Sequence, residues 1–307
     1  MASPRLSLSV PLSHGRAVAL MVLVTLMWSM AGVVTRHLDS ARSFEVTFWR
    51  SAFNVLGLGL ALHWMRGPAL WRGLLRSPWP VWVSGLCWSV MFTAFMVALT
   101  LTSVANVLVT MALGPLITAL FSRLFLRHRL AGRTWAAIAV AGAGIAWMFG
   151  HSAGTGDANS VLGTAIALAV PIAAAINWTV LQHVNHGEAD GHDMLPAVLI
   201  GAVISSLLAL PLAYPFHASA HDIGLLALLG LVQLAIPCLM VIPLSRVLSA
   251  PELSLLGLLE VIFGVLWAWV GAGESPGGTA LTGGALVIGA LVANELVALR
   301  EPRPQQA

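Results

Sequence analysis

Long apolar runs, separated by short polar segments, dominate the chain. A helix that crosses a hydrocarbon core of ~30 Å needs about 20 residues, and ten of the runs approach that length. They lie at residues 17–35, 46–64, 81–99, 103–121, 135–149, 162–181, 195–214, 223–244, 253–271 and 280–299. The pattern therefore predicts an all-α integral membrane protein with ten transmembrane helices.

The arginines are distributed unevenly between the two sides that ten helices would create. Of the fifteen arginines, twelve fall on one side, and only Arg36, Arg42 and Arg50 fall on the other. Cytoplasmic loops of membrane proteins carry an excess of Lys and Arg. The sequence therefore predicts a multi-pass protein of the cytoplasmic (inner) membrane with both termini in the cytoplasm, which agrees with an even number of helices.

The second half of the chain repeats the plan of the first half. Residues 101–148 and 247–294 align without gaps, and both contain a Ser that opens an apolar run, a special residue in mid-run and a Gly in register. These positions are Ser103 and Ser249, Gly114-Pro115 and Leu259-Glu260, and Gly132 and Gly278. A repeat of five helices is odd, so the second copy would enter the membrane upside down, as in many secondary transporters.

The repeat and the ends of the chain define the expected organisation. Residues 1–16 form an N-terminal tail, 17–150 the first five-helix repeat, 151–299 the second, and 300–307 a C-terminal tail. The first run is longer than the apolar region of a signal peptide and has no small-residue cleavage site. We therefore expect it to be retained as a span. The connections, of about ten residues each, are too short to fold as separate domains.

Four segments resemble the EamA-type permeases of the drug/metabolite transporter superfamily. They are LMWSMAGVVTR, TFWRSAF, TSVANVLVTMALGPLITALFSRLFLRHRL and SAPELSLLGLLEVIFGVLWAWVGAGESP. The resemblance covers about residues 17–298 and implies a ten-helix carrier that exports amino acids or other small metabolites by alternating access. The chain departs from the family pattern at His128, where Glu is frequent, and at Val261, where Pro is frequent.

Composition excludes several classes of protein. Hydrophobic residues make up 58% of the chain and charged residues 9%, against roughly 25% charged residues in ordinary soluble proteins. The net charge of +3 is carried by arginines dispersed between apolar runs, whereas nucleic-acid binding needs a clustered basic face. Cys87 and Cys238 lie inside apolar runs, so neither a disulfide framework nor a metal site is expected. We therefore expect no cofactor and no nucleic-acid partner.

Arg50 and Glu260 are the two ionisable residues that lie well inside predicted spans. At a rise of 1.5 Å per residue, Arg50 lies roughly 6–9 Å deep from the outer end and Glu260 roughly 10–13 Å deep from the cytoplasmic end. Charged groups inside a membrane are costly and usually face the interior of a helix bundle. These two residues are therefore the first candidates for a substrate site.

The helical neighbours of both residues, and one face of the fourth run, are small or polar, as expected of surfaces that face other helices. These stripes are Arg50, Asn54 and Gly57; Glu260, Gly264, Trp267 and Gly271; and Asn106, Thr110, Gly114 and Thr118. The substrate-binding set that we predict from this pattern is Arg50, Asn54, Glu260, Trp28, Gly114, Trp178 and Gln233.

The chemistry of Arg50 and Glu260 leaves several roles open. A guanidinium can form two hydrogen bonds with a carboxylate or phosphate, and a carboxylate can accept an ammonium group or exchange a proton during transport. An amino acid or similar amphipathic metabolite could use both groups, with apolar contact from Trp28, Trp88, Phe92 and Trp178. Alternatively, Arg50 reaches the outer interface, or the two residues only pair with each other and hold the helices together.

Other notable residues in the spans have simpler interpretations. Tryptophans in membrane helices usually pack against other helices or anchor an interface, so we expect the stripe formed by Trp88, Phe92 and Phe95 to be packing. Gln233 is expected to bond between helices, and with Pro237 one turn later it could also mark a hinge.

Two rival functions are a membrane enzyme acting on a lipid-linked substrate and a solute channel. An enzyme would need clustered acids, bases or metal ligands, and the only candidate is segment 183–193, whose His and carboxylate spacing matches no tight metal motif. A channel would need a continuous polar pore lining. The sequence therefore favours a carrier, driven either by proton exchange or by passive diffusion.

The arginine distribution makes a testable prediction about topology. A cysteine introduced at Ser77 or Arg129 should resist an impermeant thiol reagent in intact cells, because both positions are predicted to be cytoplasmic. A cysteine at Asp157 should react with the reagent. The opposite labelling pattern would show that the predicted orientation is wrong.

Overall fold

The computed structural model describes residues 12–41, 43–126, 158–187 and 193–300, together with part of 132–147. Within this part of the chain the regular structure is helical, with no strand. Seven helical segments are long and apolar enough to cross a membrane. The prediction of an all-α membrane protein is therefore confirmed, whereas the count of ten spans stays a prediction. Residues 1–11 and 301–307, which make up most of the two predicted tails, and residues 188–192 of segment 183–193 lie outside the described residues.

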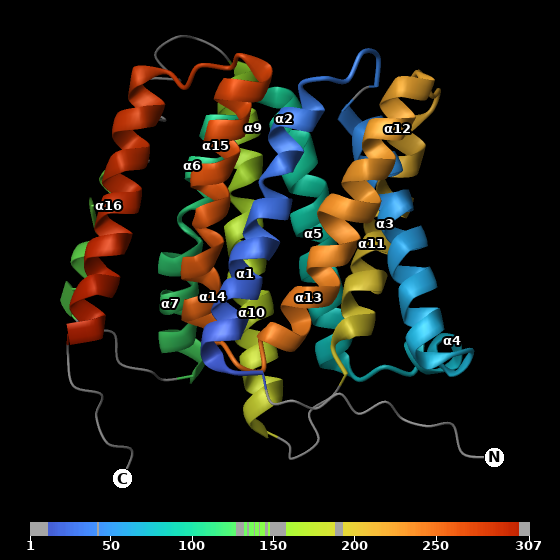
Figure 1. Ribbon diagram of the computed structural model, residues 1–307, viewed down its shortest axis with the longest axis horizontal. Coiled ribbons are helices and arrows are strands. Elements are labelled where there is room, and N and C mark those ends of the chain that lie inside the picture. The colour runs from blue at the N-terminus through green and yellow to red at the C-terminus, as the bar shows by residue number, and fades with distance from the viewer. Residues whose placement is uncertain are drawn as a thin grey trace.

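The helices stand side by side, with α1 beginning and α16 ending at the same end of the bundle (Figure 1). Several of the predicted spans consist of two helices separated by a short break. The elements are α1 (His14–Trp28), α2 (Met30–Thr35), α3 (Ser43–Arg66), α4 (Ala69–Leu74), α5 (Trp79–Leu101), α6 (Val104–Met111), α7 (Gly114–Leu126), α9 (Ala158–Ala167), α10 (Ala169–Gly187), α11 (Leu195–Ala213), α12 (Ala220–Leu228), the π-helix η1 (Leu229–Ala235), α13 (Ile236–Leu244), α14 (Ala250–Gly257), α15 (Leu259–Ala272) and α16 (Gly278–Arg300).

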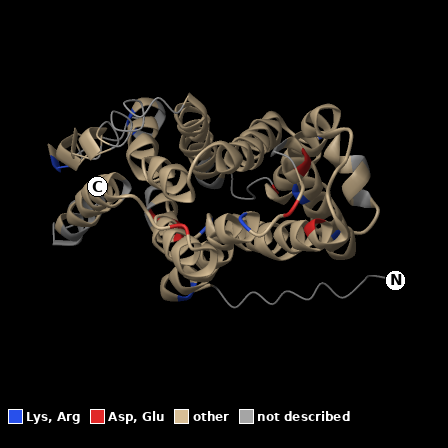
Figure 2. Ribbon diagram, turned by 90° about the horizontal axis from the view of Figure 1, so that it is seen from above, with Lys and Arg blue, Asp and Glu red and all other residues tan. Residues whose placement is uncertain are grey.

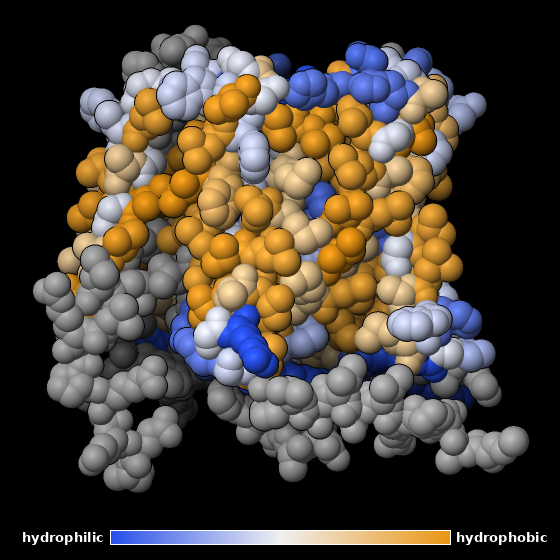
Figure 3. All heavy atoms as spheres, in the orientation of Figure 1, coloured by the Kyte–Doolittle hydropathy of each residue, from blue (hydrophilic) through white to orange (hydrophobic). Residues whose placement is uncertain are grey.

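The outer surface of the bundle is apolar between two polar ends (Figure 3). Large apolar side chains point outward there; Leu60 is 64% exposed and Val270 is 80% exposed. Seen from above, charged residues occupy few positions along the ribbon of the described helices (Figure 2). Such a surface matches the hydrocarbon core of a bilayer rather than water.

The breaks inside the spans have local causes in the sequence. Pro115 follows the break between α6 and α7, and Pro171 follows the break between α9 and α10. Proline lacks an N–H and crowds the preceding turn, so it disrupts a helix at these points. At the break between α1 and α2, the Ser29 hydroxyl donates to the Leu26 carbonyl at 2.7 Å, a bond that often bends helices. Gly257 precedes the break between α14 and α15, and glycine weakens a helix.

Two buried carboxylates hold together the loops at the end of the bundle where α12 begins. Asp222 accepts hydrogen bonds from the backbone N–H groups of Asp39, at 2.7 Å, and Ser40, at 3.1 Å. Glu45 accepts from the N–H groups of His217 and Ala218, at 2.9 and 2.7 Å. Charge-assisted bonds of this kind are stronger than neutral ones, so the loop before α3 is joined firmly to the loop before α12.

Glycine permits a close approach between helices at the contact of α5 with α11. A Cβ atom on Gly201 would lie 2.8 Å from the Gly85 carbonyl oxygen and 3.0 Å from the Ser89 nitrogen. Small residues at such crossings let two backbones come together in a membrane. The position therefore tolerates no side chain without a shift of one helix.

This contact predicts a difference between two glycine substitutions. Gly201→Ala should destabilise the protein by about 1–3 kcal/mol, because the added methyl group overpacks the crossing. At about 2–4 °C per kcal/mol, the melting temperature of the detergent-purified protein should fall by several degrees. Gly224→Ala is the matched control, since a Cβ there meets nothing within 4 Å. Equal melting temperatures for the two variants would contradict the close contact.

Candidate functional site

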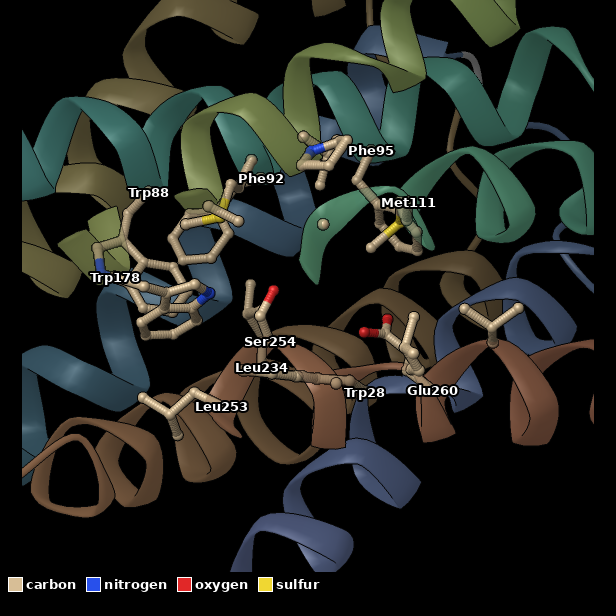
Figure 4. Close-up of a pocket in the computed structure, with 18 of the residues that line it drawn as sticks. Trp28, Trp88, Phe92, Phe95, Met111, Trp178, Leu234, Leu253, Ser254 and Glu260 are labelled. Carbon is tan, nitrogen blue, oxygen red and sulfur yellow. The ribbon is translucent and has the colours of Figure 1, made fainter. Parts of the chain in front are cut away.

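A cavity of about 130 Å³ lies between helices from the first and second halves of the chain (Figure 4). Its polar side chains belong to Arg50 on α3, Gln233 on η1, Ser254 on α14 and Glu260 on α15. The rest of the lining is apolar, aromatic or glycine. For comparison, an apolar cavity of ~150 Å³ in another protein holds a benzene molecule. The cavity therefore suits a small organic molecule with one apolar part.

Six of the seven residues predicted to bind substrate line this cavity. They are Trp28, Arg50, Gly114, Trp178, Gln233 and Glu260. Asn54 does not line it, although it lies one turn of α3 from Arg50. Asn54 is fully buried where α3 packs against η1, and a Cβ on Gly230 would lie 2.9 Å from its backbone nitrogen. The cavity therefore gives no support for Asn54 as a binding residue.

Arg50 is held inside the bundle by a neighbouring glutamine. Its Nε and Nη2 donate to Gln233 Oε1 at 3.3 and 3.0 Å, and Nη1 has no hydrogen-bond partner. Gln233 Nε2 in turn donates to the Trp28 carbonyl at 2.9 Å. The guanidinium carbon lies 5.8 Å from the centre of the Phe95 ring. Because Arg50 is only 2% exposed, the alternative in which its side chain reaches the outer interface is wrong.

Glu260 lies in the first turn of α15, directly after the break that separates this helix from α14. Its carboxylate points into the cavity (Figure 4). The N-terminus of a helix carries partial positive charge, which favours an acidic side chain in the first turn. The break therefore provides both the position and part of the electrostatic support for this carboxylate.

Arg50 and Glu260 do not form an ion pair with each other. Among the described residues, three other pairs of oppositely charged groups have N–O distances within 4.0 Å. These pairs are His14–Glu252, Arg36–Glu274 and Arg66–Asp193. The charges of Arg50 and Glu260 act on each other through space, but without direct contact the alternative in which the two residues only bind each other gains no support. The cavity presents a positive and a negative side chain at separate places.

The aromatic stripe on α5 lines the cavity as well as packing against other helices. The ring centres of Trp88 and Phe92 are 5.4 Å apart, and the Trp88 ring meets Trp178 of α10 edge to face at 5.8 Å. Such pairs stabilise a fixed arrangement of rings. From the sequence we expected this stripe only to pack against other helices. Spacing along α5 could not show that α10 supplies the partner ring or that the rings border a cavity.

Ser254 also lines the cavity, and it was not among the residues predicted from the sequence. Its hydroxyl lies 3.2 Å from that of Thr118 on α7, and it points into the cavity (Figure 4). A serine within an apolar run, three residues before Gly257 and six before Glu260, is the signal that could have identified it. It adds a neutral donor and acceptor to the two charged groups.

One end of the bundle is fastened by a group centred on Arg36. Its Nε donates to Glu274 Oε2 at 2.7 Å, and its Nη1 and Nη2 donate to the carbonyls of Leu99 and Thr102, both at 3.0 Å. The other oxygen of Glu274 accepts from the backbone N–H of Val104 at 2.8 Å. These bonds join α2, α5 and α6 to the segment that follows α15.

Comparison with known proteins finds a family model that matches the first half of the chain and a solved structure with a similar fold. Residues 15–150 match the model of the EamA-like transporter family. A solved structure described only as "Crystal structure of protein" is similar over 94% of this chain and 100% of its own length, with a TM-score of 0.66 and 22% identity. That similarity concerns the fold alone. No curated protein matches the sequence.

Because Arg50 and Glu260 form no ion pair, replacing the Glu260 carboxylate by a neutral amide should change the stability of the protein little. Breaking a buried ion pair costs about 3–5 kcal/mol, which would lower the melting temperature by roughly 10 °C. Glu260→Gln breaks no such pair, so its melting temperature should stay within about 2 °C of the wild type. Thermal unfolding followed by tryptophan fluorescence measures this directly. A fall near 10 °C would restore the pairing alternative.

Proposed function

We propose that this chain, whose residues 15–150 match the EamA-like transporter family of the drug/metabolite transporter superfamily, is an alternating-access carrier for a small organic metabolite. The observation that carries the proposal is the central cavity, which is formed by both halves of the chain and contains two opposite charges that form no ion pair with each other. A carrier of this type is expected to hold its substrate between its two halves.

The preferred substrate is an amino acid or a similar amphipathic metabolite. A carboxylate on the substrate would meet Arg50 and an ammonium group would meet Glu260. The apolar part would contact Trp28, Trp88 and Trp178, which line the same cavity. The cavity therefore has one partner for each part of such a molecule.

The inverted repeat is part of this proposal, and the positions of two helices support it. A shift of 146 residues takes α6 onto α14, from first residue to last. The two run in opposite directions: Val104, which begins α6, bonds Glu274 beyond the end of α15, whereas Glu252 near the start of α14 bonds His14 at the start of α1. This relation favours the division into five-helix halves at 17–150 and 151–299.

Orientation, direction and energy source complete the proposal. Helix α1 begins and helix α16 ends at the same end of the bundle. Together with the arginine distribution, this favours cytoplasmic termini in the inner membrane. Family membership favours export. Glu260 is the residue that would exchange a proton if transport is coupled to a proton gradient, and passive diffusion is the alternative.

Counterflow in proteoliposomes tests the carrier and its two charges. Saturable counterflow of labelled amino acids, tested one by one, is expected for the wild type, whereas unsaturated flux would indicate a channel. For the compound that the wild type carries best, Glu260→Gln should lower the initial rate at least tenfold, because it removes the charge while keeping size and hydrogen bonding. Arg50→Lys should be similarly severe, because Lys lacks the planar fork that binds a carboxylate.

The control is Glu252→Gln, which changes a carboxylate outside the cavity that bonds His14 and the Ser249 backbone. It should transport within about twofold of the wild type. Normal counterflow in Glu260→Gln, at normal stability, would remove Glu260 from the mechanism.

A further inference from the structure

We propose that Gln233 is a positioning residue that orients the Arg50 guanidinium, so that the edge carrying Nη1 is left for a carboxylate of the substrate. The inference rests on the proposed carrier function and assigns a distinct role to Gln233. In this role Gln233 acts through Arg50, which binds the substrate directly.

The hydrogen bonds of Arg50 divide its guanidinium into an occupied edge and a free edge. A guanidinium carries five N–H groups in a planar fork. Gln233 Oε1 accepts from both Nε and Nη2, which form one edge, at 3.3 and 3.0 Å. Nη1, on the remaining edge, has no hydrogen-bond partner although Arg50 is only 2% exposed. The side chain is therefore held by one edge and left unsatisfied on the other.

Gln233 is itself anchored, so it can hold Arg50 in one orientation. Its Nε2 donates to the carbonyl of Trp28 at 2.9 Å. Trp28 is the last residue of α1, and carbonyl groups at a helix end are available to partners outside that helix. With Nε2 bonded to a carbonyl, the amide must turn its oxygen toward Arg50. The orientation of the amide is thus determined from both of its ends.

The local backbone presents Gln233 at this place. Gln233 lies within η1, a π-helical segment between α12 and α13. A π-helical turn contains an extra residue and changes the direction of the side chains that follow, and such turns are frequent at functional sites. The segment also packs against α3, which carries Arg50.

An unsatisfied charged donor favours a ligand with a matching acceptor. Leaving a buried charged donor unpaired costs more free energy than leaving a neutral one unpaired. A carboxylate can bind the Nη1 edge through two charge-assisted bonds, whereas a neutral amide offers one oxygen and no charge. The site should therefore prefer a zwitterion to the corresponding amide by at least tenfold in affinity.

The test compares a ligand pair that differs only at this group. Binding of L-leucine and L-leucinamide to the purified full chain would be measured by the concentration dependence of thermal stabilisation. We expect L-leucine to bind the wild type at least tenfold more tightly. In Gln233→Glu, the new carboxylate neutralises Arg50, so this ratio should fall to about one. In Gln233→Leu the guanidinium loses its orientation, and the ratio should fall at least threefold.

The control is Gln182→Glu, which makes the same change at a glutamine outside the cavity lining; it should keep the wild-type ratio. A loss of packing alone would weaken both ligands equally and leave the ratio unchanged. An unchanged ratio in both Gln233 variants would therefore overturn the positioning role, while leaving the carrier function to be decided by counterflow. If neither Gln233 variant folds, the same affinity ratio is measured for Arg50→Lys. An unchanged ratio in that variant would show that the orientation of the planar guanidinium is irrelevant and would overturn the proposal.

A wild type that does not distinguish the two ligands, or that binds neither of them nor any other amino acid, would overturn carboxylate recognition at Arg50. Saturable counterflow of a compound without a carboxylate would then still support a carrier. The two failures are therefore distinguishable.

Discussion

Polar groups inside a bilayer must find partners within the protein, and the broken helices are where this constraint acts most strongly. Each break leaves backbone groups without their usual helical partners. The Trp28 carbonyl beside the first break accepts from Gln233, and Glu260 lies in the first turn after another break. Part of the chemistry of the cavity therefore lies at points where the helices are interrupted, whereas Arg50 lies within the continuous helix α3.

Charged groups at the end of the bundle where α12 begins have partners of a different kind from those in its centre. At the end where α12 begins, Asp222 and Glu45 are saturated by backbone N–H groups, which gives rigid loops. In the centre, Arg50 keeps an unpaired nitrogen and Glu260 has no ion-pair partner among the described residues. Satisfied charges hold the frame of the molecule together, and unsatisfied charges lie where a ligand could complete them.

The helical membrane fold could be predicted from the sequence because an apolar run of about 20 residues is rarely compatible with any structure except a membrane-spanning helix. The inward position of Arg50 and Glu260 could also be predicted, because the free-energy cost of a charge that faces lipid depends little on tertiary detail. Pro115 indicated one break, whereas nothing as strong in the sequence indicates the break after Trp28. The partner of Arg50 and the enclosed position of Asn54 depend on which helices are neighbours and how they are rotated. That information is absent from the spacing along a single helix.

Glu274 is at the same time a helix cap and an ion-pair partner. One oxygen accepts from the Val104 N–H at the start of α6, and the other accepts from Arg36 beyond the end of α2. Because a single carboxylate makes both bonds, a movement that withdraws it uncaps α6 and leaves Arg36 without its anion in the same step. The two losses are coupled, so this end of the bundle resists partial loosening.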